Sequence, residues 1–239
     1  LTYQWQYKTP TGSWKNSVGT GKTTDTLSTT ATIARNNYQF HCIVTDANGN
    51  QVISDAVTLA VFGIKTQPKA ISTVAGQNVT MKVAAVGEDL TYQWQYKTPT
   101  GSWKNSVGEG NKTDTLSISA TTGRADYQFR CIVKDGDGNK VTSSAAKLTV
   151  LGIKTQPKAV TADKGTTVTF KVVATGEDLT YQWQYKTPTG SWKNSVSEGK
   201  NTDTLSVVAT AARNNYQFRC IVKSGSNSVT SNAVALTVK

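Results

Sequence analysis

The sequence predicts an all-β protein built as a tandem row of antiparallel β-sandwiches, and three observations carry this prediction. The stretch LTYQWQYKTPTGSWKNSV recurs unchanged at Leu1, Leu90 and Leu179. The resulting period of 89 residues is the size of a small domain, not of a solenoid unit. Between turn signals, apolar and polar residues alternate over short segments, which is typical of half-buried strands, and no window has apolar residues at helical spacing.

The middle copy of the repeat shows the expected strands in chain order. Val79, Met81 and Val83 alternate with polar neighbours and predict a strand with one apolar face. TPTG at 98–101 and DGDGN at 135–139 predict tight turns, because proline fixes φ and glycine and asparagine tolerate left-handed backbone. ATTGRA at 120–125 predicts a single helical turn at a corner. Strands are expected at residues 78–85, 90–97, 102–107, 114–119, 126–133 and 145–150.

Composition narrows the classes of function. Lys and Arg exceed Asp and Glu by 26 to 15, which gives a net charge of +11, but the basic residues are scattered singly. This pattern favours a solvated surface, with attraction to an acidic cell-wall polymer or a sulfated or sialylated glycan as the alternative. Nucleic acid is not an expected partner, because no basic segment carries interleaved aromatic residues. No apolar run approaches the length of a membrane span.

The titratable residues do not predict a catalytic or metal centre. The only histidine, His41, is expected on the outward side of its strand as an exposed residue without a fixed partner. The cysteines of the same strand point inward, so a nucleophile and a base would lie on opposite faces. DGDGN lacks the distal glutamate of a calcium loop and is predicted to be a plain hairpin turn. We therefore expect no enzyme, no metal and no cofactor.

The chain has three cysteines, one at the same place in each repeat: Cys42, Cys131 and Cys220. No repeat can therefore close a disulfide within itself, and a bridge between repeats would need equivalent core positions to meet. We expect three buried free thiols that pack as small apolar side chains.

The motifs YQW, TLS and YQFRC together resemble an immunoglobulin-like (Ig-like) domain. They are most similar to the bacterial Ig-like repeats found in tandem on surface proteins of Gram-positive bacteria. The resemblance places Trp5, Trp94 and Trp183 at the core position of strand C, and the three cysteines at that of strand F. The strand B partner of the cysteine is Val83 or Val172, so the core is expected to hold valine, cysteine and tryptophan without a disulfide.

The same resemblance divides the chain into 1–62, 63–151 and 152–239. The first part contains strands C to G only, so its inward residues lack the partner that strand B supplies in the other two. A donated strand, from another chain or an upstream segment, is expected to complete it. The junction at Leu151–Ile153 is about three residues long and contains no flexible Gly/Ser run, which predicts a semi-rigid linear row.

The resemblance implies an extracellular protein of the cell surface or cell wall whose repeats act as non-catalytic adhesion and spacer modules. The alternative is a dedicated module that binds a glycan or a host protein such as a mucin or an immunoglobulin. Whether Trp103 and Trp192 are exposed or buried should separate the two. The candidate binding face comprises Gln93, Gln95, Trp103, Gln128, Arg130 and Ile132.

Overall fold

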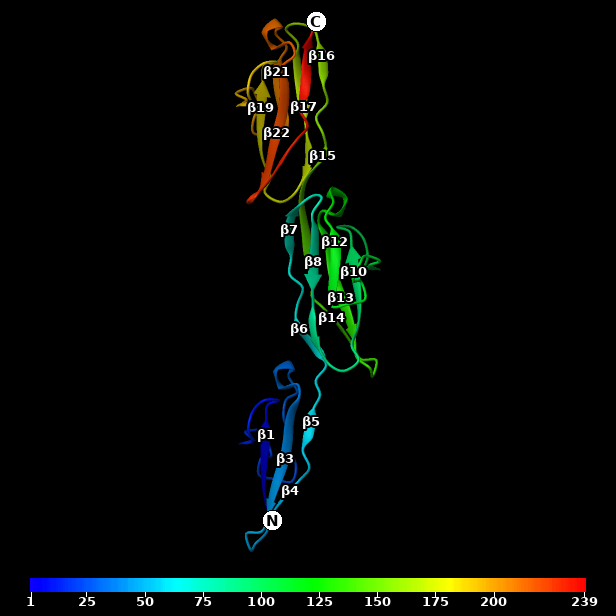
Figure 1. Ribbon diagram of the computed structural model, residues 1–239, viewed down its shortest axis with the longest axis vertical. Coiled ribbons are helices and arrows are strands. Elements are labelled where there is room, and N and C mark those ends of the chain that lie inside the picture. The colour runs from blue at the N-terminus through cyan, green and yellow to red at the C-terminus, as the bar shows by residue number, and fades with distance from the viewer.

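The computed structural model describes residues 1–239 and arranges them as three units joined end to end in a long row (Figure 1). The N-terminus lies near one end of the row and the C-terminus at the other. We call residues 1–62, 63–151 and 152–239 repeats 1, 2 and 3. Strands make up nearly all regular structure, and the few helical residues are short 3₁₀ turns. The expected all-β fold of tandem antiparallel sandwiches is confirmed.

Repeat 2 packs two layers of strands against each other. The larger sheet has the order β11–β10–β13–β15, with β14 on β13 and β7 running parallel to β15. The facing layer contains the pairs β12–β8 and β6–β9. The strands are β6 (Gly63–Thr66), β7 (Ile71–Val74), β8 (Asn78–Lys82), β9 (Ala84–Val86), β10 (Thr91–Lys97), β11 (Lys104–Asn105), β12 (Thr115–Ser119), β13 (Tyr127–Lys134), β14 (Lys140–Thr142) and β15 (Ala146–Thr155), with the turn η2 (Thr122–Arg124).

The core of repeat 2 forms where the inward residues of the two layers meet. Trp94 lies opposite Cys131 in the strand register, and Val83 from the facing layer belongs to the same cluster. All three side chains are completely buried. Leu116 on β12 pairs with Met81 on β8 and closes the other side of the core. The alternation in the sequence therefore determined which face of each strand is inside.

Repeat 3 has the same plan. Its larger sheet has the order β16–β24–β22–β19–β20, with β23 on β22, and β17 pairs with β21 in the facing layer. Trp183, Cys220 and Val172 are completely buried, as their counterparts are in repeat 2. The strands are β16 (Val160–Ala162), β17 (Thr167–Lys171), β18 (Val173–Thr175), β19 (Thr180–Lys186), β20 (Lys193–Asn194), β21 (Thr204–Val208), β22 (Gln217–Ser224), β23 (Asn227–Thr230) and β24 (Val234–Val238), with the turn η3 (Ala211–Arg213).

Repeat 1 contains one sheet without a facing layer. Its order is β2–β1–β3–β4, with β5 also on β3. Residues 26–30, which correspond to β12, make only an isolated bridge between Thr20 and Ser28. As a result, Trp5 and Leu27 stay half-buried, although Trp94 and Leu116 are fully buried. The strands are β1 (Thr2–Lys8), β2 (Lys15–Asn16), β3 (Tyr38–Thr45), β4 (Gln51–Ile53) and β5 (Val57–Leu59), with the turn η1 (Ile33–Arg35).

One continuous strand, β15, joins repeats 2 and 3, so the junction is not the separate linker that the sequence suggested. Its first half pairs with β13 and β7, and its second half pairs with β18 of repeat 3. Leu151, in the middle of the strand, is buried in the core of repeat 3. Gly152 is needed there, because a Cβ atom would come within 2.5 Å of Thr122 Cγ2 and 2.9 Å of Ala75 Cβ.

Side chains also tie repeats 2 and 3 together. Lys147 Nζ lies 2.9 Å from an Asp126 carboxylate oxygen of repeat 2 and 2.6 Å from Glu177 Oε1 of repeat 3. The Thr175 hydroxyl donates to the Val150 carbonyl at 2.8 Å. The two carboxylates raise the pKa of Lys147 to about 12, so the lysine is charged at neutral pH.

The junction between repeats 1 and 2 is less regular. Strand β5 ends at Leu59, and β6 begins only at Gly63. The counterparts of Lys147 and Asp126 are Thr58 and Asn37, which cannot form the same ion pairs. Phe62 in this segment packs against the core of repeat 2.

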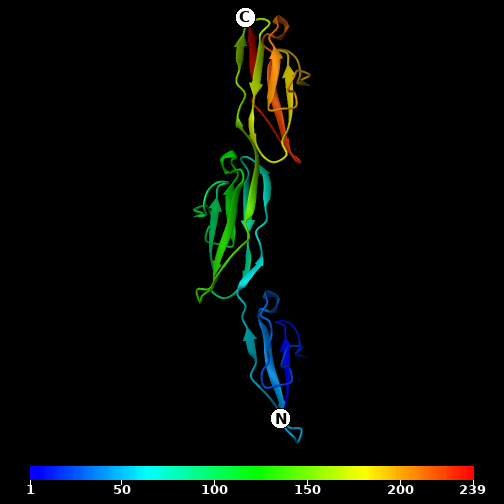
Figure 2. The ribbon, with the colours of Figure 1, turned by 180° about the vertical axis from the view of Figure 1, so that it is seen from behind.

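Successive repeats face alternate sides of the row. In Figure 1 the β1 edge of repeat 1 and the β19 edge of repeat 3 point to one side, and the β10 edge of repeat 2 points to the other. The view from behind in Figure 2 shows the same alternation. Any surface carried on this edge is therefore presented in opposite directions by neighbouring repeats.

Candidate functional site

The candidate face of repeat 2 is an ordered ladder of polar side chains across three strands. Gln95 on β10 lies opposite Arg130 on β13 and also opposite Asn105 on β11. Arg130 Nε donates to Gln95 Oε1 at 2.9 Å, and Gln95 Nε2 donates to Asn105 Oδ1 at 3.0 Å. Each side chain thus holds the next one in place. This order lowers the entropy cost of fixing these side chains when a partner binds.

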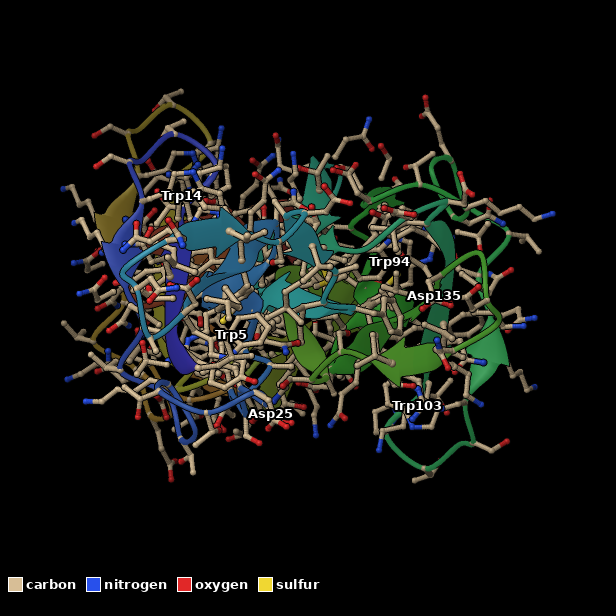
Figure 3. All side chains as sticks on the ribbon, turned by 90° about the horizontal axis from the view of Figure 1, so that it is seen from below. Trp5, Trp14, Asp25, Trp94, Trp103 and Asp135 are labelled. Atoms are coloured by element: carbon tan, nitrogen blue, oxygen red, sulfur yellow. The ribbon has the colours of Figure 1, made fainter.

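Trp103 is half-buried and forms the flank of this ladder. The Arg130 guanidinium carbon lies 4.2 Å from the centre of the indole ring, and Lys97 Nζ lies 5.3 Å from it. These are cation–π distances. The ring is therefore neither fully exposed beside the glutamines nor packed into the core, the two positions that the sequence left open. Figure 3 places Trp103 at the periphery and Trp94 inside.

Repeat 3 reproduces the arrangement in detail. Arg219 Nε donates to Gln184 Oε1 at 2.9 Å, and Gln184 Nε2 donates to Asn194 Oδ1 at 2.9 Å. The Arg219 guanidinium carbon lies 4.2 Å from the ring centre of Trp192, and Lys186 Nζ lies 5.3 Å from it. The Trp–Arg–Gln–Asn ladder is thus a feature of both complete repeats.

Repeat 1 replaces the arginine with His41, and here the expectation of an exposed histidine was wrong. His41 is 7% exposed, because the Trp14 ring stacks on it with centroids 3.7 Å apart. Its Nε2 also lies 3.0 Å from Gln6 Oε1. Burial, with a smaller contribution from Lys8, lowers the pKa of His41, so the imidazole is neutral at pH 7. Figure 3 shows Trp14 and Trp103 on opposite sides of the long axis.

The remaining candidate residues lie on the same face but differ in how free they are. Gln93 lies opposite Ile132, and both are half-buried. The Gln93 amide already donates to the Trp94 carbonyl at 2.8 Å, so this side chain offers a partner contact surface more than free N–H donors. Gln128 lies opposite Lys97 and is also half-buried. The structure thus brings all six candidates together on one side of strands β10 and β13.

Sequence reasoning missed two members of this site, Lys97 and Asn105. Lys97 supplies a second cation to Trp103, and Asn105 ends the amide ladder. Both lie in the stretch that is identical in the three copies, which was the available signal. Their roles were not visible, because the pairing of β10 with β11 depends on a turn whose register the sequence does not specify.

The cysteines lie on the opposite side of the sheet from this face. All three are buried and free of disulfides. Burial raises the pKa of the Cys131 thiol to about 11 and that of Cys220 to about 12, so both thiols are protonated at neutral pH. The Cys131 N–H donates to the buried Ser143 hydroxyl at 2.8 Å, a contact that Cys220 repeats with Ser231.

The structure contains no group of three or more His, Cys, Asp or Glu side chains placed to hold a metal ion. None of its helices has the length and hydrophobicity that crossing a membrane requires. No family model matches the sequence, and no curated protein matches it.

The solved structures that match include three multidomain proteins, each with a low TM-score. Extracellular domains 3–5 of Drosophila OTK cover all of this chain and 86% of their own, with 14% identity and a TM-score of 0.41. The insect immune protein hemolin covers 99% of this chain and 67% of its own, with 14% identity and a TM-score of 0.44. A chimeric titin Z1Z2 tandem covers 75% of this chain and 100% of its own, with 17% identity and a TM-score of 0.28.

Likeness at this level says nothing about function, and the class of protein rests on the strand pairing itself. In repeats 2 and 3, strand C pairs with strand F, the core tryptophan faces the strand F cysteine, and a second layer closes the sandwich. The chain is a tandem row of Ig-like β-sandwiches.

Proposed function

We propose that the chain is the non-catalytic Ig-like repeat region of a bacterial surface protein, located outside the cell at its surface or in its wall, where it acts as a row of adhesion and spacer modules. The observation that carries the proposal is strand β15, which runs without a break from one repeat into the next. A shared strand resists bending at the junction more than a flexible linker does. A stiff row suits a part that holds a distal domain away from a surface.

The free cysteines support the same role. The core of each complete repeat is held by valine, cysteine and tryptophan without a disulfide. The repeats therefore fold without an oxidising step, and their stability does not change with the redox state of the surroundings.

Deletion of residues 63–151 tests the spacer role directly, because it removes one whole repeat. On intact producing cells, the deletion should bring an epitope at the surface-distal end of the row closer to the surface. That epitope should react more slowly with an antibody, although the total amount of protein is unchanged. A control with residues 63–151 duplicated should react faster. Equal reactivity of all three would refute the spacer role, and a signal found only inside the cells would refute the location.

The alternative is a dedicated binding module that recognises a glycan or a host protein such as a mucin or an immunoglobulin. The observation that favours it is the preorganised Trp103–Arg130–Gln95–Asn105 ladder and its copy in repeat 3. Tryptophan and arginine are the residues that most often dominate binding energy at interfaces.

A glycan array and a host-protein pulldown with the whole chain test this alternative. The double variant Trp103→Ala/Trp192→Ala should lose any partner that the wild type captures. Val52→Ala/Val57→Ala is the matched control, because both valines are exposed and lie in repeat 1, away from Trp103 and Trp192. Retention of the partner by the tryptophan variant would exclude the face as its binding site.

We also propose that a strand from outside residues 1–62 completes repeat 1, supplied by another chain or by an upstream segment. The support is the pairing of β8 with β12 in repeat 2, which buries Leu116 and Ile118. The corresponding residues 26–30 of repeat 1 have no such partner within this chain. A synthetic peptide of residues 75–86 should protect them from hydrogen exchange, and a peptide with Met81→Asp should not.

A further inference from the structure

A small pocket recurs at the same place in every repeat, at the end of the sandwich beside the 3₁₀ turn. Its volume is about 160 Å³ in repeat 1, 280 Å³ in repeat 2 and 210 Å³ in repeat 3. In repeat 2 its lining includes Tyr96, Ser106, Val107, Arg124, Tyr127 and Phe129. It is separate from the ladder on the outer face of β10 and β13.

Aromatic rings build the wall of the pocket. Tyr96 and Tyr127 stack with their centroids 5.8 Å apart and their planes only 3° apart. The buried Phe129 belongs to the same lining. Tyr7 with Tyr38, and Tyr185 with Tyr216, form the same stack in repeats 1 and 3 at 5.8 and 5.9 Å. Each pocket thus offers flat apolar surface together with phenol and serine hydroxyls.

An arginine supplies the only charge in the lining. Arg124 Nη1 donates to the Ser119 carbonyl at 2.8 Å, and Arg213 Nη1 donates to the Val208 carbonyl at 2.8 Å. One such bond leaves most of the five guanidinium donors available. Neither arginine forms a salt bridge, and no Asp or Glu lines any of the three pockets. The positive charge in each pocket is therefore uncompensated.

The arginine persists where its surroundings vary between repeats. Its neighbours two positions earlier are Ile33, Thr122 and Ala211, yet the arginine itself is present in all three copies. At the rim, Val18, Val107 and Val196 are 83%, 94% and 84% exposed. Because these valines bury almost nothing, core packing does not account for an apolar residue at the rim in all three copies.

We propose that each of these end pockets binds one carboxylate-bearing sugar residue of a glycan. The volumes lie below the range of about 300–1,000 Å³ that is usual for sites of drug-sized ligands, so a single residue fits. A sugar acid combines a carboxylate for the arginine, hydroxyls for serine and tyrosine, and an apolar ring face for the aromatic wall and the valine rim. An aspartate or glutamate side chain would use the arginine alone.

The charge and the shape of the whole chain support the same ligand. A net charge of +11 attracts a polyanion before contact, and the attraction extends over about one Debye length, roughly 8–10 Å at ordinary salt. Each repeat carries one pocket, and because neighbouring repeats face opposite sides of the row, a polymer or a dense glycan layer on one side can reach the pockets of repeats 1 and 3 together. The proposal does not depend on the spacer role and can fail or hold separately from it.

The test uses the whole chain and three probes: 3′-sialyllactose, neutral lactose and a tetraglutamate peptide. We expect sialyllactose to shift the NMR signals of Val18, Val107 and Val196, and lactose and tetraglutamate to bind at least about tenfold more weakly, the effect of one charge-assisted hydrogen bond. Equal binding of lactose would overturn the role of the carboxylate. Equal or tighter binding of tetraglutamate would contradict a sugar ligand and indicate an acidic peptide instead.

Two pairs of variants locate the site. Arg124→Gln/Arg213→Gln should weaken sialyllactose binding in repeats 2 and 3 about tenfold, and Arg130→Gln/Arg219→Gln, which changes the net charge equally on the outer face, should not. Val107→Glu should weaken binding in repeat 2 and Val107→Lys should strengthen it. Because Val107 is almost fully exposed, neither change should affect folding. Equal losses in the two arginine pairs, or no response to Val107→Glu, would overturn the proposal.

Discussion

Repeats 1 and 2 share the same 18 residues, starting at Leu1 and at Leu90, yet these residues have different surroundings in the structure. In both, the tryptophan of strand C sits on an identical strand opposite an identical cysteine, and its indole N–H donates to a threonine carbonyl, Thr24 in one and Thr113 in the other. Trp94 is nevertheless completely buried, and Trp5 is only half-buried. The difference lies in the facing layer, which residues 63–89 supply to repeat 2.

The same comparison extends to the ends of the two repeats. Strand β15 continues into repeat 3, because β7 pairs with it in parallel from Leu148 to Leu151. The counterpart β5 has no such partner and stops after three residues. A missing layer therefore affects the junction as well as the core, since the strand that should cross the junction has no partner on its second edge.

The largest expected effect comes from giving repeat 1 the layer that repeat 2 has. Fusion of a copy of residues 63–89 directly before Leu1 should bury Trp5 and turn residues 26–30 into a strand. Burial of three side chains equivalent to Val79, Met81 and Val83 should raise the free energy of unfolding of repeat 1 by roughly 5 kcal/mol. Hydrogen exchange resolved by repeat measures the gain. The same fusion with Met81→Asp is the control, and equal protection in both would contradict the comparison.

A matched pair of leucines gives the next largest effect. Leu116→Ala removes a fully buried side chain in repeat 2 and should cost about 2–5 kcal/mol. Leu27→Ala at the corresponding, half-buried place in repeat 1 should cost about 1 kcal/mol, because little apolar area is lost. Urea unfolding followed by NMR signals of each repeat measures both values. Equal costs would mean that the core of repeat 1 is as closed as that of repeat 2.

The cysteines should differ in the same direction. Cys131→Ser and Cys220→Ser place a hydroxyl in an apolar cluster and should each cost about 1–3 kcal/mol, and Cys42→Ser should cost less. In the native protein, a thiol-reactive dye should leave Cys131 and Cys220 unlabelled until unfolding. Cys42, which lies on a sheet without a facing layer, should be the first of the three cysteines to react when labelling begins. Fast labelling of Cys131 or Cys220 would show that their cores are not closed.

At alkaline pH, the difference in stability between the complete repeats 2 and 3 and the incomplete repeat 1 should decrease. Burial raises the pKa of Cys131 from 9.0 to about 11 and that of Cys220 to about 12, so the unfolded thiol ionises first. Their contribution to stability is complete below about pH 9 and is lost as the pH rises through 11 and 12. Cys131→Ala should remove part of this fall in repeat 2. An unchanged pH profile in that variant would assign the fall to other groups.

The smallest expected effect concerns the two junctions. Lys147→Ala removes the exposed ion pairs that link repeats 2 and 3 and should change stability by less than about 1 kcal/mol. It should still broaden the distance distribution between spin labels placed at Val107 and Val196. In the wild type, labels at Val18 and Val107 should already give a broader distance distribution than labels at Val107 and Val196. Equal widths at both junctions would contradict the role of β15 and its ion pairs.

Sequence reasoning succeeded where the deciding contact is local and failed where it is remote. The alternation around Met81, Leu116 and Cys131 was enough to place each side chain inside, because successive residues of a strand face opposite sides. His41 was misjudged, because the ring that covers it belongs to Trp14 on a different strand. The end pocket was missed for the same reason, since Tyr96, Arg124 and Val107 meet only after the strands pair.

By itself, the sequence determined the number of repeats, the strands and their inward faces, and the absence of any disulfide partner for the cysteines. These features depend on residue spacing and on the geometry of a single strand. Only the tertiary structure decided that Trp94 is buried and Trp5 is not, that β15 crosses a junction, and that an arginine and two tyrosines share a pocket. Burial and pocket shape sum contributions from segments far apart in the chain, so identical stretches have different environments wherever their distant partners differ.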